Sequence, residues 1–294
     1  MFTIVVTHYN RSDFLLKAIK SFPLESSLLD EVIIVDNGSG ENELSKIRGM
    51  IKKFPKTRLI LHPSGNANTA RNIGFMSSNS EWICFCDDDD YFREDKLSYL
   101  SQKINSKKNI DIIYNAVFVS FFGSKIGYKT KPNVTSTRMD PTEFIVNRLG
   151  STSGLTIKKD ALSDVGGFDE HLDSLQDYEL YLRLALRGSQ ILVLDEALTI
   201  YFKGLSDSQV SSGLTRLNES MLYIEKKYSK HFSSIEKDAY LLFIRWKKRL
   251  KFQKGIESGR WLAAVKESND VGLKYKLICI LRYIVLRVAS CFCR

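Results

Sequence analysis

Four short apolar runs, spaced so that a helix fits between neighbours, constrain the fold of this chain more than any other feature. They span Phe2 to Val6, Val32 to Val35, Arg58 to Leu61 and Trp82 to Cys86. Short runs rich in β-branched residues are typical of parallel strands that are buried on both faces. The stretches between them resemble helices and cover Asp13 to Ser21, Glu43 to Lys53 and Ala70 to Ser77. This alternation predicts a doubly wound α/β sheet.

Polar residues follow three of the four predicted strands. They are Thr7 to Arg11, Asp36 to Ser39 and Asp87 to Asp90. Because ligands of doubly wound sheets bind outside the carboxyl ends of the strands, we expect these loops to meet at one ligand site. The sequence lacks the glycine-rich fingerprints of dinucleotide-binding folds and of P-loops. Phosphates must therefore be held by other groups.

The aspartate run, Asp87 to Asp90, consists of four consecutive carboxylates. Carboxylates this close repel one another unless a cation lies between them. Mg²⁺ or Mn²⁺ binds one or two carboxylates and completes its shell with water and substrate phosphates. The position of the run beside two other polar loops favours a metal site for the diphosphate of a nucleotide-sugar. A solvated acidic turn is the alternative.

A second acidic cluster contains Asp177. Apolar residues recur at helical spacing from Tyr178 onward, so Asp177 is expected at the N-terminus of a helix. The helix dipole favours a carboxylate there and keeps it ionised near neutral pH. Both a general base and a plain N-terminal helix acid fit this position.

Six sequence blocks together resemble family 2 glycosyltransferases of the GT-A fold. They are Thr-His-Tyr-Asn-Arg from residue 7, Ile-Val-Asp-Asn-Gly-Ser from 34, Asn-Thr-Ala-Arg-Asn-Ile-Gly from 68, Phe-Cys-Asp-Asp-Asp-Asp-Tyr from 85, Gly-Gly-Phe-Asp-Glu from 166 and Gln-Asp-Tyr-Glu-Leu from 176. The blocks occur in the family's order and cover about residues 1 to 210. The resemblance implies transfer of a sugar from a nucleotide-sugar to an acceptor hydroxyl.

The resemblance also implies roles for residues of the first two polar loops. Thr7, Tyr9 and Arg11 would hold the nucleotide, and Asp36 would accept a hydrogen bond from its base, commonly uracil. Arg71 would face the diphosphate, with a structural ion pair as the alternative.

Within the aspartate run, the resemblance places Asp87 near the ribose and Asp89 on the metal. Asp90 would lie toward the donor sugar or the acceptor. Asp88 is grouped with the nucleotide-binding residues, although the residue between such a pair is expected to point away. Four identical residues leave this register open by one position.

Asp177 matches the family's catalytic base, which takes the proton of the acceptor hydroxyl. One base on one face implies inversion, so an α-linked donor would give a β-glycoside. Glu179 would lie near the acceptor or donor sugar. The alternative is that Glu179 and Arg183 only orient the first turn of the helix.

The sequence departs from the family pattern after the predicted strand Leu192 to Leu198. Many relatives have a histidine there that binds metal or diphosphate, whereas the stretch from Tyr201 to Ser208 has none. Lys203 is a substitute contact for phosphate. His8 and His62 are interpreted as local loop or packing residues.

Basic residues are concentrated in the tail. Residues 245 to 294 contain 13 lysines and arginines against three acidic residues, whereas the net charge of the whole chain is +9. The near-neutral remainder argues against nucleic acid as a partner. Leu277 to Cys293 is apolar except for two arginines, too short and too charged to span a membrane comfortably. An interfacial helix on an anionic membrane is expected, with a packed helical cap or a homodimer contact as alternatives.

These observations divide the chain into a catalytic domain, residues 1–213, and a helical basic region, residues 214–294. The chain opens directly on a strand without a leader pattern, and its five cysteines lack zinc spacing. A cytoplasmic protein, peripheral on the inner face of the membrane, is therefore expected.

The expected function is transfer from a UDP-sugar to a lipid-linked or oligosaccharide acceptor during assembly of O-antigen, capsule or lipopolysaccharide. A nucleotidyltransferase is one alternative, but it would need a glycine-rich basic loop after the first strand. A non-catalytic sugar-binding adaptor is the other, and the presence of Asp87, Asp89 and Asp177 disfavours it.

Overall fold

The structure is a computed structural model that describes residues 1–294 except 64, 108, 122–124, 135, 204–212, 236, 258–263, 266–267, 269–270 and 293–294. For residues 282 and 285–292 it describes only the backbone.

The first half of the chain alternates strands and helices as the sequence predicts. Its elements are β1 (Phe2–His8), α1 (Ser12–Ser21), β2 (Leu29–Asp36), α2 (Glu41–Ile51), β3 (Thr57–Leu61), α3 (Ala67–Met76) and β4 (Trp82–Asp87). All four predicted strands and all three helices are confirmed, with ends that differ by a few residues. β1 extends two residues beyond the predicted Val6, which brings His8 into the sheet.

The second half adds antiparallel and long strands that the sequence pattern did not reveal. It contains β5 (Tyr91–Phe92), α4 (Lys96–Ser106), β6 (Ile112–Phe121), β7 (Gly127–Lys129), η1 (Glu143–Ile145), η2 (Thr152–Gly154), β8 (Leu155–Lys158), α5 (Lys159–Asp164), α6 (Gln176–Arg187) and β9 (Ile191–Lys203). The predicted strand Leu192 to Leu198 forms the first half of β9, which continues to Lys203 because it pairs with β6 over most of its length.

The strands form one mixed sheet in the order β3-β2-β1-β4-β8-β6-β9-β5, with β7 on the outer side of β6. β1 pairs in parallel with β2 on one side and with β4 on the other. Successive strands are therefore added on one side of β1 up to β3 and on its other side from β4 onward. In sheets of this kind the crevice outside the carboxyl ends of the two flanking strands is where ligands bind. The ends of β1 and β4 are therefore the first place to look for a site.

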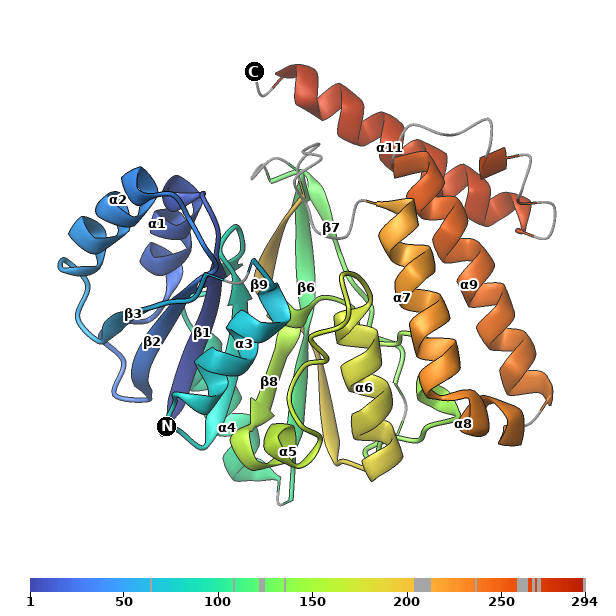
Figure 1. The fold of residues 1–294 in the computed structure, drawn as a ribbon, viewed down its shortest axis with the longest axis horizontal. Helices are drawn as coiled ribbons and strands as arrows, with labels where there is room; N and C mark the ends of the chain where they lie inside the picture. Colours follow the sequence, from blue (N-terminus) through green and yellow to red (C-terminus); the bar gives the residue numbers. More distant parts are fainter. Residues whose placement is uncertain are drawn as a thin grey trace.

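Helices cover both faces of the sheet (Figure 1). Alternate residues of each strand point to opposite faces, so Ile4 and Val6 pack with α1, α2 and α4, whereas Val5 packs with α3. α5 and α6 share this second core. The sheet is thus buried on both sides, which explains the nearly uninterrupted apolar runs of β1, β2 and β4.

The C-terminal part of the chain is helical. It consists of α7 (Leu214–Lys227), α8 (Ser229–Ser234), α9 (Lys237–Glu257) and α11 (Leu273–Phe292). α7 and α9 stand beside α6, and α11 crosses the end of α9 (Figure 1). A single apolar cluster joins Tyr178 and Leu182 of α6 with Met221 and Ile224 of α7 and Phe243 of α9. The proposed boundary between residues 213 and 214 therefore runs next to a shared core.

Candidate active site

The polar loops after β1, β2 and β4 meet at the carboxyl edge of the sheet. His8 lies opposite Asp36 in the strand register, and Thr7 lies between Val35 and Asp87. The loop after β1 is held against the loop after β2, because the Asn10 amide donates to the Ser39 hydroxyl at 2.8 Å and the Gly40 amide donates to Asn10 Oδ1 at 2.9 Å. The structure thus brings the predicted nucleotide loops together.

Asp88 turns toward the β1 loop and is fully buried, which corrects the expectation that it points away. His8 Nδ1 lies 2.8 Å from Asp88 Oδ2, and the Tyr9 amide donates to the same oxygen at 3.4 Å. Asp88 also pairs with Arg11. A buried carboxylate needs such partners because it has lost its water. Asp88 therefore fixes the shape of the β1 loop, and His8 is its buried neighbour.

Arg11 bridges two members of the aspartate run. Its guanidinium contacts Asp88, and Nη1 donates to Asp89 Oδ2 at 2.8 Å. The pKa of Asp89 is raised to about 6, mainly because the side chain is buried; Arg11 opposes this rise, and Asp87 and Asp88 contribute to it. Arg11 supplies positive charge at the place where the sequence predicts a metal.

Asp90 lies beneath this surface and is fully buried, so it does not reach a sugar, contrary to the sequence prediction. Its Oδ1 accepts from the Phe202 amide at 3.0 Å, whereas its buried Oδ2 has no hydrogen-bond partner among the residues that the structure describes. Burial and the neighbouring carboxylates Asp89 and Asp87 raise its pKa well above the ordinary value.

Asp87 and Arg71 form an ion pair on the other side of the run. Arg71 Nη2 donates to Asp87 Oδ1 at 2.8 Å, and the Arg71 side chain is only 5% exposed. The Asp87 amide donates to the Ser153 hydroxyl at 3.2 Å. The predicted diphosphate contact and its structural alternative are both compatible with this placement, because one guanidinium can face two anions.

Asp36 keeps one carboxylate oxygen unengaged. Its Oδ1 accepts from the amides of Gly38 and Ser39 at 3.2 and 2.9 Å, which closes the turn after β2. Its buried Oδ2 has no hydrogen-bond partner within the described part of the chain. Nearby, the Tyr9 side chain is 54% exposed. A buried acceptor oxygen without a partner among the described residues and an exposed ring therefore lie on the two loops of the predicted nucleotide position.

Asp177 lies in the first turn of α6, as predicted, and is half-buried. Its Oδ1 accepts from the Tyr178 amide at 2.8 Å. The pKa of Asp177 is raised to about 6, mainly by burial; the Tyr178 amide and Arg71 oppose this rise, and Asp87 contributes to it. The charges of Arg71 and Asp87 act on Asp177, so the base candidate belongs to the same site as the aspartate run.

Asparagines of α3 connect the two acidic clusters, and sequence reasoning missed their role. Asn72 donates to the Phe168 carbonyl at 2.9 Å and accepts from the Phe168 amide at 2.8 Å. Asn68 donates to the carbonyls of Asp169 and Leu172, both at 2.8 Å. Asn68 and Asn72 stand four residues apart on α3 and so share one face of the helix, and that spacing was the available signal.

Glu179 does not reach a sugar site, contrary to the sequence prediction. Its carboxylate is fully buried and bonds to Arg183, to Lys227 of α7 and to Tyr228. Residues two apart on a helix do not share a face, so Glu179 points away from the side of α6 that carries Asp177. The alternative, an orienting role shared with Arg183, fits this arrangement.

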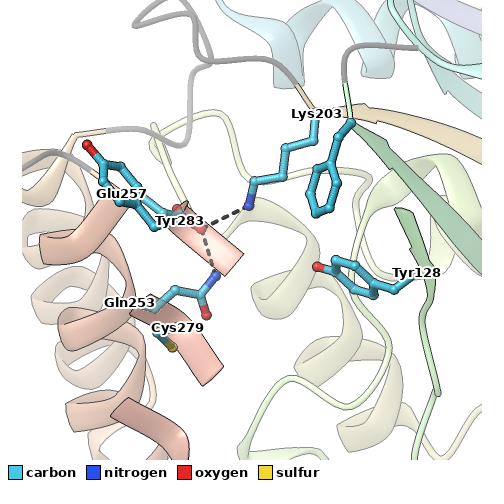
Figure 2. Close-up of a pocket in the computed structure, with 7 residues that line it drawn as sticks. Tyr128, Lys203, Gln253, Glu257, Cys279 and Tyr283 are labelled. Carbon is cyan, nitrogen blue, oxygen red and sulfur yellow. Dashed lines mark hydrogen bonds and ion pairs between the residues drawn. The ribbon is translucent and has the colours of Figure 1, made fainter. Parts of the chain in front are cut away.

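Lys203, the predicted phosphate substitute, pairs with Glu257 of α9 at 2.9 Å (Figure 2). Gln253 donates to the same Glu257 oxygen at 2.9 Å. These residues line a small hollow that is partly open to solvent, together with Phe121, Tyr128, Cys279 and Tyr283. It lies at the ends of β6 and β9, between the sheet and the C-terminal helices, and Lys203 is engaged there. The stretch from Tyr201 to Ser208, in which the sequence lacks the family's histidine, lies outside the described residues from residue 204 onward.

A divalent ion fits the donor set in part. Among the described residues, no three histidine, cysteine, aspartate or glutamate side chains converge as a complete protein cage. Mg²⁺ and Mn²⁺ sites that bind substrate phosphates need only one or two carboxylates from the protein. Asp87 and Asp89 are the members of the aspartate run whose side chains reach solvent, with 30% and 11% exposed, and Asp89 is the predicted ligand.

Sequence comparison decides the family. The family model described as "Glycosyl transferase family 2" matches residues 3–166, more than half of the chain and all three strand-end loops. The chain belongs to glycosyl transferase family 2. It is 29% identical over 231 residues to an uncharacterized glycosyltransferase of Haemophilus influenzae, and the match covers 78% of each chain. The present chain is also 26% identical over 190 residues to the chondroitin synthase of Pasteurella multocida. That match covers only 19% of the synthase.

Solved structures support the fold of this family 2 glycosyltransferase. S. aureus TarS 1–349, determined in complex with UDP-GlcNAc, has a TM-score of 0.59 at 14% identity, covering 90% of this chain and 88% of TarS. The mannosyltransferase PcManGT from Pyrobaculum calidifontis, in complex with GDP-Man and Mn²⁺, has a TM-score of 0.60 at 13% identity, covering 98% and 86%. The expected GT-A fold with a helical C-terminal region is confirmed.

The helices in the described part of this glycosyltransferase include none with the length and apolarity needed to cross a membrane.

Proposed function

We propose that the protein is an inverting, metal-dependent glycosyltransferase that moves a sugar from a UDP-sugar to an acceptor hydroxyl. The environment of Asp177 is the observation that supports this proposal most strongly. Asp177 is a half-buried carboxylate with a pKa raised to about 6, and the charges of Arg71 and Asp87 act on it. A base with a pKa near the working pH is ionised often enough to accept a proton and is basic enough to hold it.

In this mechanism Asp177 takes the proton of the acceptor hydroxyl while the hydroxyl oxygen attacks the anomeric carbon. One base on one side of the sugar gives inversion, so an α-linked donor yields a β-glycoside. A divalent ion on Asp89 would supply positive charge to the departing diphosphate. Arg71 would face the same diphosphate while keeping its pair with Asp87.

The nucleotide would lie on the loops after β1 and β2. The unengaged Asp36 Oδ2 can accept the N–H of a uracil ring, and the exposed Tyr9 can stack on a base. Arg11 is within the same loop and already faces two carboxylates, so its charge would offset theirs beside the diphosphate. The solved complexes of TarS with UDP-GlcNAc and of PcManGT with GDP-Man support a nucleotide-sugar donor in general.

The acceptor would approach from the second half of the sheet. The hollow beside Lys203 offers aromatic rings and paired charges at the edge of the sheet that also carries Asp87 to Asp90. Side chains of these kinds recognise the faces and hydroxyls of sugar rings. A lipid-linked or oligosaccharide acceptor of bacterial surface-polysaccharide assembly remains our proposal.

Membrane attachment would be peripheral and on the cytoplasmic face. Leu273, Leu277, Leu281 and Ile284 are exposed along α11, and Lys274 is exposed beside them. An apolar stripe next to basic residues suits the surface of an anionic bilayer.

Thermal unfolding with UDP, GDP and dTDP, each with and without Mn²⁺, tests the donor site. A ligand at one hundred times its Kd stabilises the folded state by about 2.7 kcal/mol. We expect UDP with Mn²⁺ to raise the Tm, UDP alone to raise it less, and Asp89→Asn to remove the effect of the metal. A Tm unchanged by every nucleotide would contradict the proposal and favour a non-catalytic adaptor.

A further inference from the structure

We infer that the C-terminal helix α7 positions the base of the reaction, with Lys227 as the positioning residue that fixes the turn carrying Asp177. This inference rests on the proposed role of Asp177. Three sets of contacts and one backbone conformation support it, all in the segment that contains Asp177.

Glu179 is the first point of attachment. Arg183 Nε donates to both Glu179 oxygens at 2.9 and 3.0 Å, and Lys227 Nζ donates to Oε1 at 2.7 Å. The Tyr228 hydroxyl donates to the same Oε1 at 2.5 Å. A fully buried carboxylate is stabilised only while such partners stay in place. The first turn of α6 is therefore tied to α7 and to the residue that follows it.

Lys227 joins this turn to the segment that leads into it. Its ammonium lies 2.7 Å from Glu179 Oε1 and 2.6 Å from Asp169 Oδ2. Tyr223, one helical turn earlier on α7, donates to the same Asp169 oxygen at 3.0 Å. Asn68 of α3 holds the Asp169 carbonyl from the other side. One cation thus spans the entry and the first turn of α6.

Tyr178 supplies a third attachment. Its fully buried hydroxyl donates to the Ile145 carbonyl at 2.7 Å, and its ring centroid lies 4.7 Å from that of Trp246 in α9. The residues immediately after Asp177, Tyr178 and Glu179, are therefore both held by the C-terminal helices.

The backbone before Asp177 shows why this support matters. Leu175 has a φ of 61° and a ψ of 21°, in the left-handed region. That conformation is unfavourable for a residue with a side chain, and it persists where surrounding contacts enforce it. The clamp made by Lys227 lies on both sides of Leu175. Without it, we expect the first turn of α6 to relax and Asp177 to become more exposed to water.

The experiment follows the ionisation of Asp177 without any substrate. Asp177 Oδ1 accepts from the Tyr178 amide, so the nitrogen-15 NMR shift of that amide reports the charge on Asp177. In the full-length protein we expect a transition near pH 6, absent in Asp177→Asn, which assigns the signal. Lys227→Met should move this midpoint down by about one pH unit or more, toward the ordinary value of 3.8, because a more exposed carboxylate ionises more easily.

The direction of this shift separates positioning from simple loss of charge. Removing a cation without moving Asp177 would leave the midpoint unchanged or raise it. Lys227→Arg should restore the wild-type midpoint. Tyr228→Phe removes only one donor and should give a smaller downward shift, and it replaces Lys227→Met as the test if that variant folds poorly. Lys226→Met is the matched control, since Lys226 is the exposed neighbour on the same helix.

An unchanged or raised midpoint in folded Lys227→Met and Tyr228→Phe would overturn the inference. Failure of the proposed function gives a different result. If Asp177→Asn retained full transfer activity, Asp177 would not be the base, whatever the NMR midpoints of the Lys227 variants.

Discussion

At the scale of single residues, the environment of Asp177 affects both the pKa of its carboxylate and the stability of the fold. Burial raises its pKa to about 6, so the carboxylate is protonated more readily than one in water. The folded-state pKa lies above the ordinary 3.8, so folding is favoured by protonated Asp177 and disfavoured as pH rises from about 4 through 6. The proposed base, held under these conditions, lowers the stability of the fold at neutral pH.

The pH dependence of transfer should follow from the same pKa. Because the base must be ionised, kcat should rise as pH increases through about 6 and level off above it. Initial rates across this range measure the effect. A rate that does not change between pH 5 and pH 7, about one unit on either side of the pKa, would contradict the assignment.

Asp177→Asn provides the control for this prediction. We expect it to lower kcat by about 10²- to 10⁴-fold while leaving UDP binding nearly intact, since the amide cannot accept the proton. At pH 7 its free energy of unfolding should not fall, because the substitution removes an unfavourable buried charge. Loss of donor binding together with kcat would indicate a structural role instead.

At the scale of elements, α3 is the helix that joins the two acidic clusters. It carries Arg71 beside Asp87 and places Asn68 and Asn72 against the segment before α6. It can do so because it packs closely on β1. A Cβ at Gly74 would lie 2.3 Å from Val5 Cγ1, so only glycine allows this approach.

Gly74→Ala should therefore destabilise the protein by about 1–3 kcal/mol, the usual cost of overpacking a core. Urea denaturation measures the change. Gly49→Ala in α2 is the matched control, because nothing lies within 4 Å of the added Cβ, and it should be neutral or stabilising by up to about 1 kcal/mol. Equal stability of the two variants would show that α3 can shift away from β1 at no cost.

At the scale of the whole molecule, the C-terminal helices have two different sides. α7 and α9 share a core with α6, and Cys279 and Tyr275 of α11 pack against Phe252 of α9. The opposite side of α11 presents its apolar residues to solvent. A packed cap and a membrane-binding surface, which the sequence offered as alternatives, are therefore compatible in one helix.

The exposed side should bind anionic vesicles. Leu277→Ser combined with Leu281→Ser should weaken binding to vesicles of equal parts phosphatidylglycerol and phosphatidylcholine by tenfold or more, because each buried leucine contributes about 1.5–3 kcal/mol. Co-sedimentation measures this, with pure phosphatidylcholine testing the role of charge. Leu222→Ser on α7, a leucine of similar exposure, is the control. Unchanged vesicle binding in the double variant would contradict the membrane-binding role of α11 and leave only its role as a packed cap.

The sequence by itself determined the first half of the sheet and the loops at its edge. β1 to β4 are short parallel strands whose burial on both faces requires uninterrupted apolar residues, so local composition shows them directly. The order of these strands then places Thr7 to Arg11, Asp36 and Asp87 to Asp90 together. The position of Asp177 in the first turn of a helix was also predictable, because the start of a helix has a local sequence signature.

Only the tertiary structure decided which polar side chains are partners within the protein. Asp88 meets His8 and Arg11 about 80 residues away, Glu179 meets Lys227 nearly 50 residues away, and Lys203 meets Glu257. The same holds for β6, β8 and β9, which pair across long stretches of chain. A carboxylate that will be buried and one that will face a ligand look alike in sequence, because the difference lies in the distant groups that surround each of them.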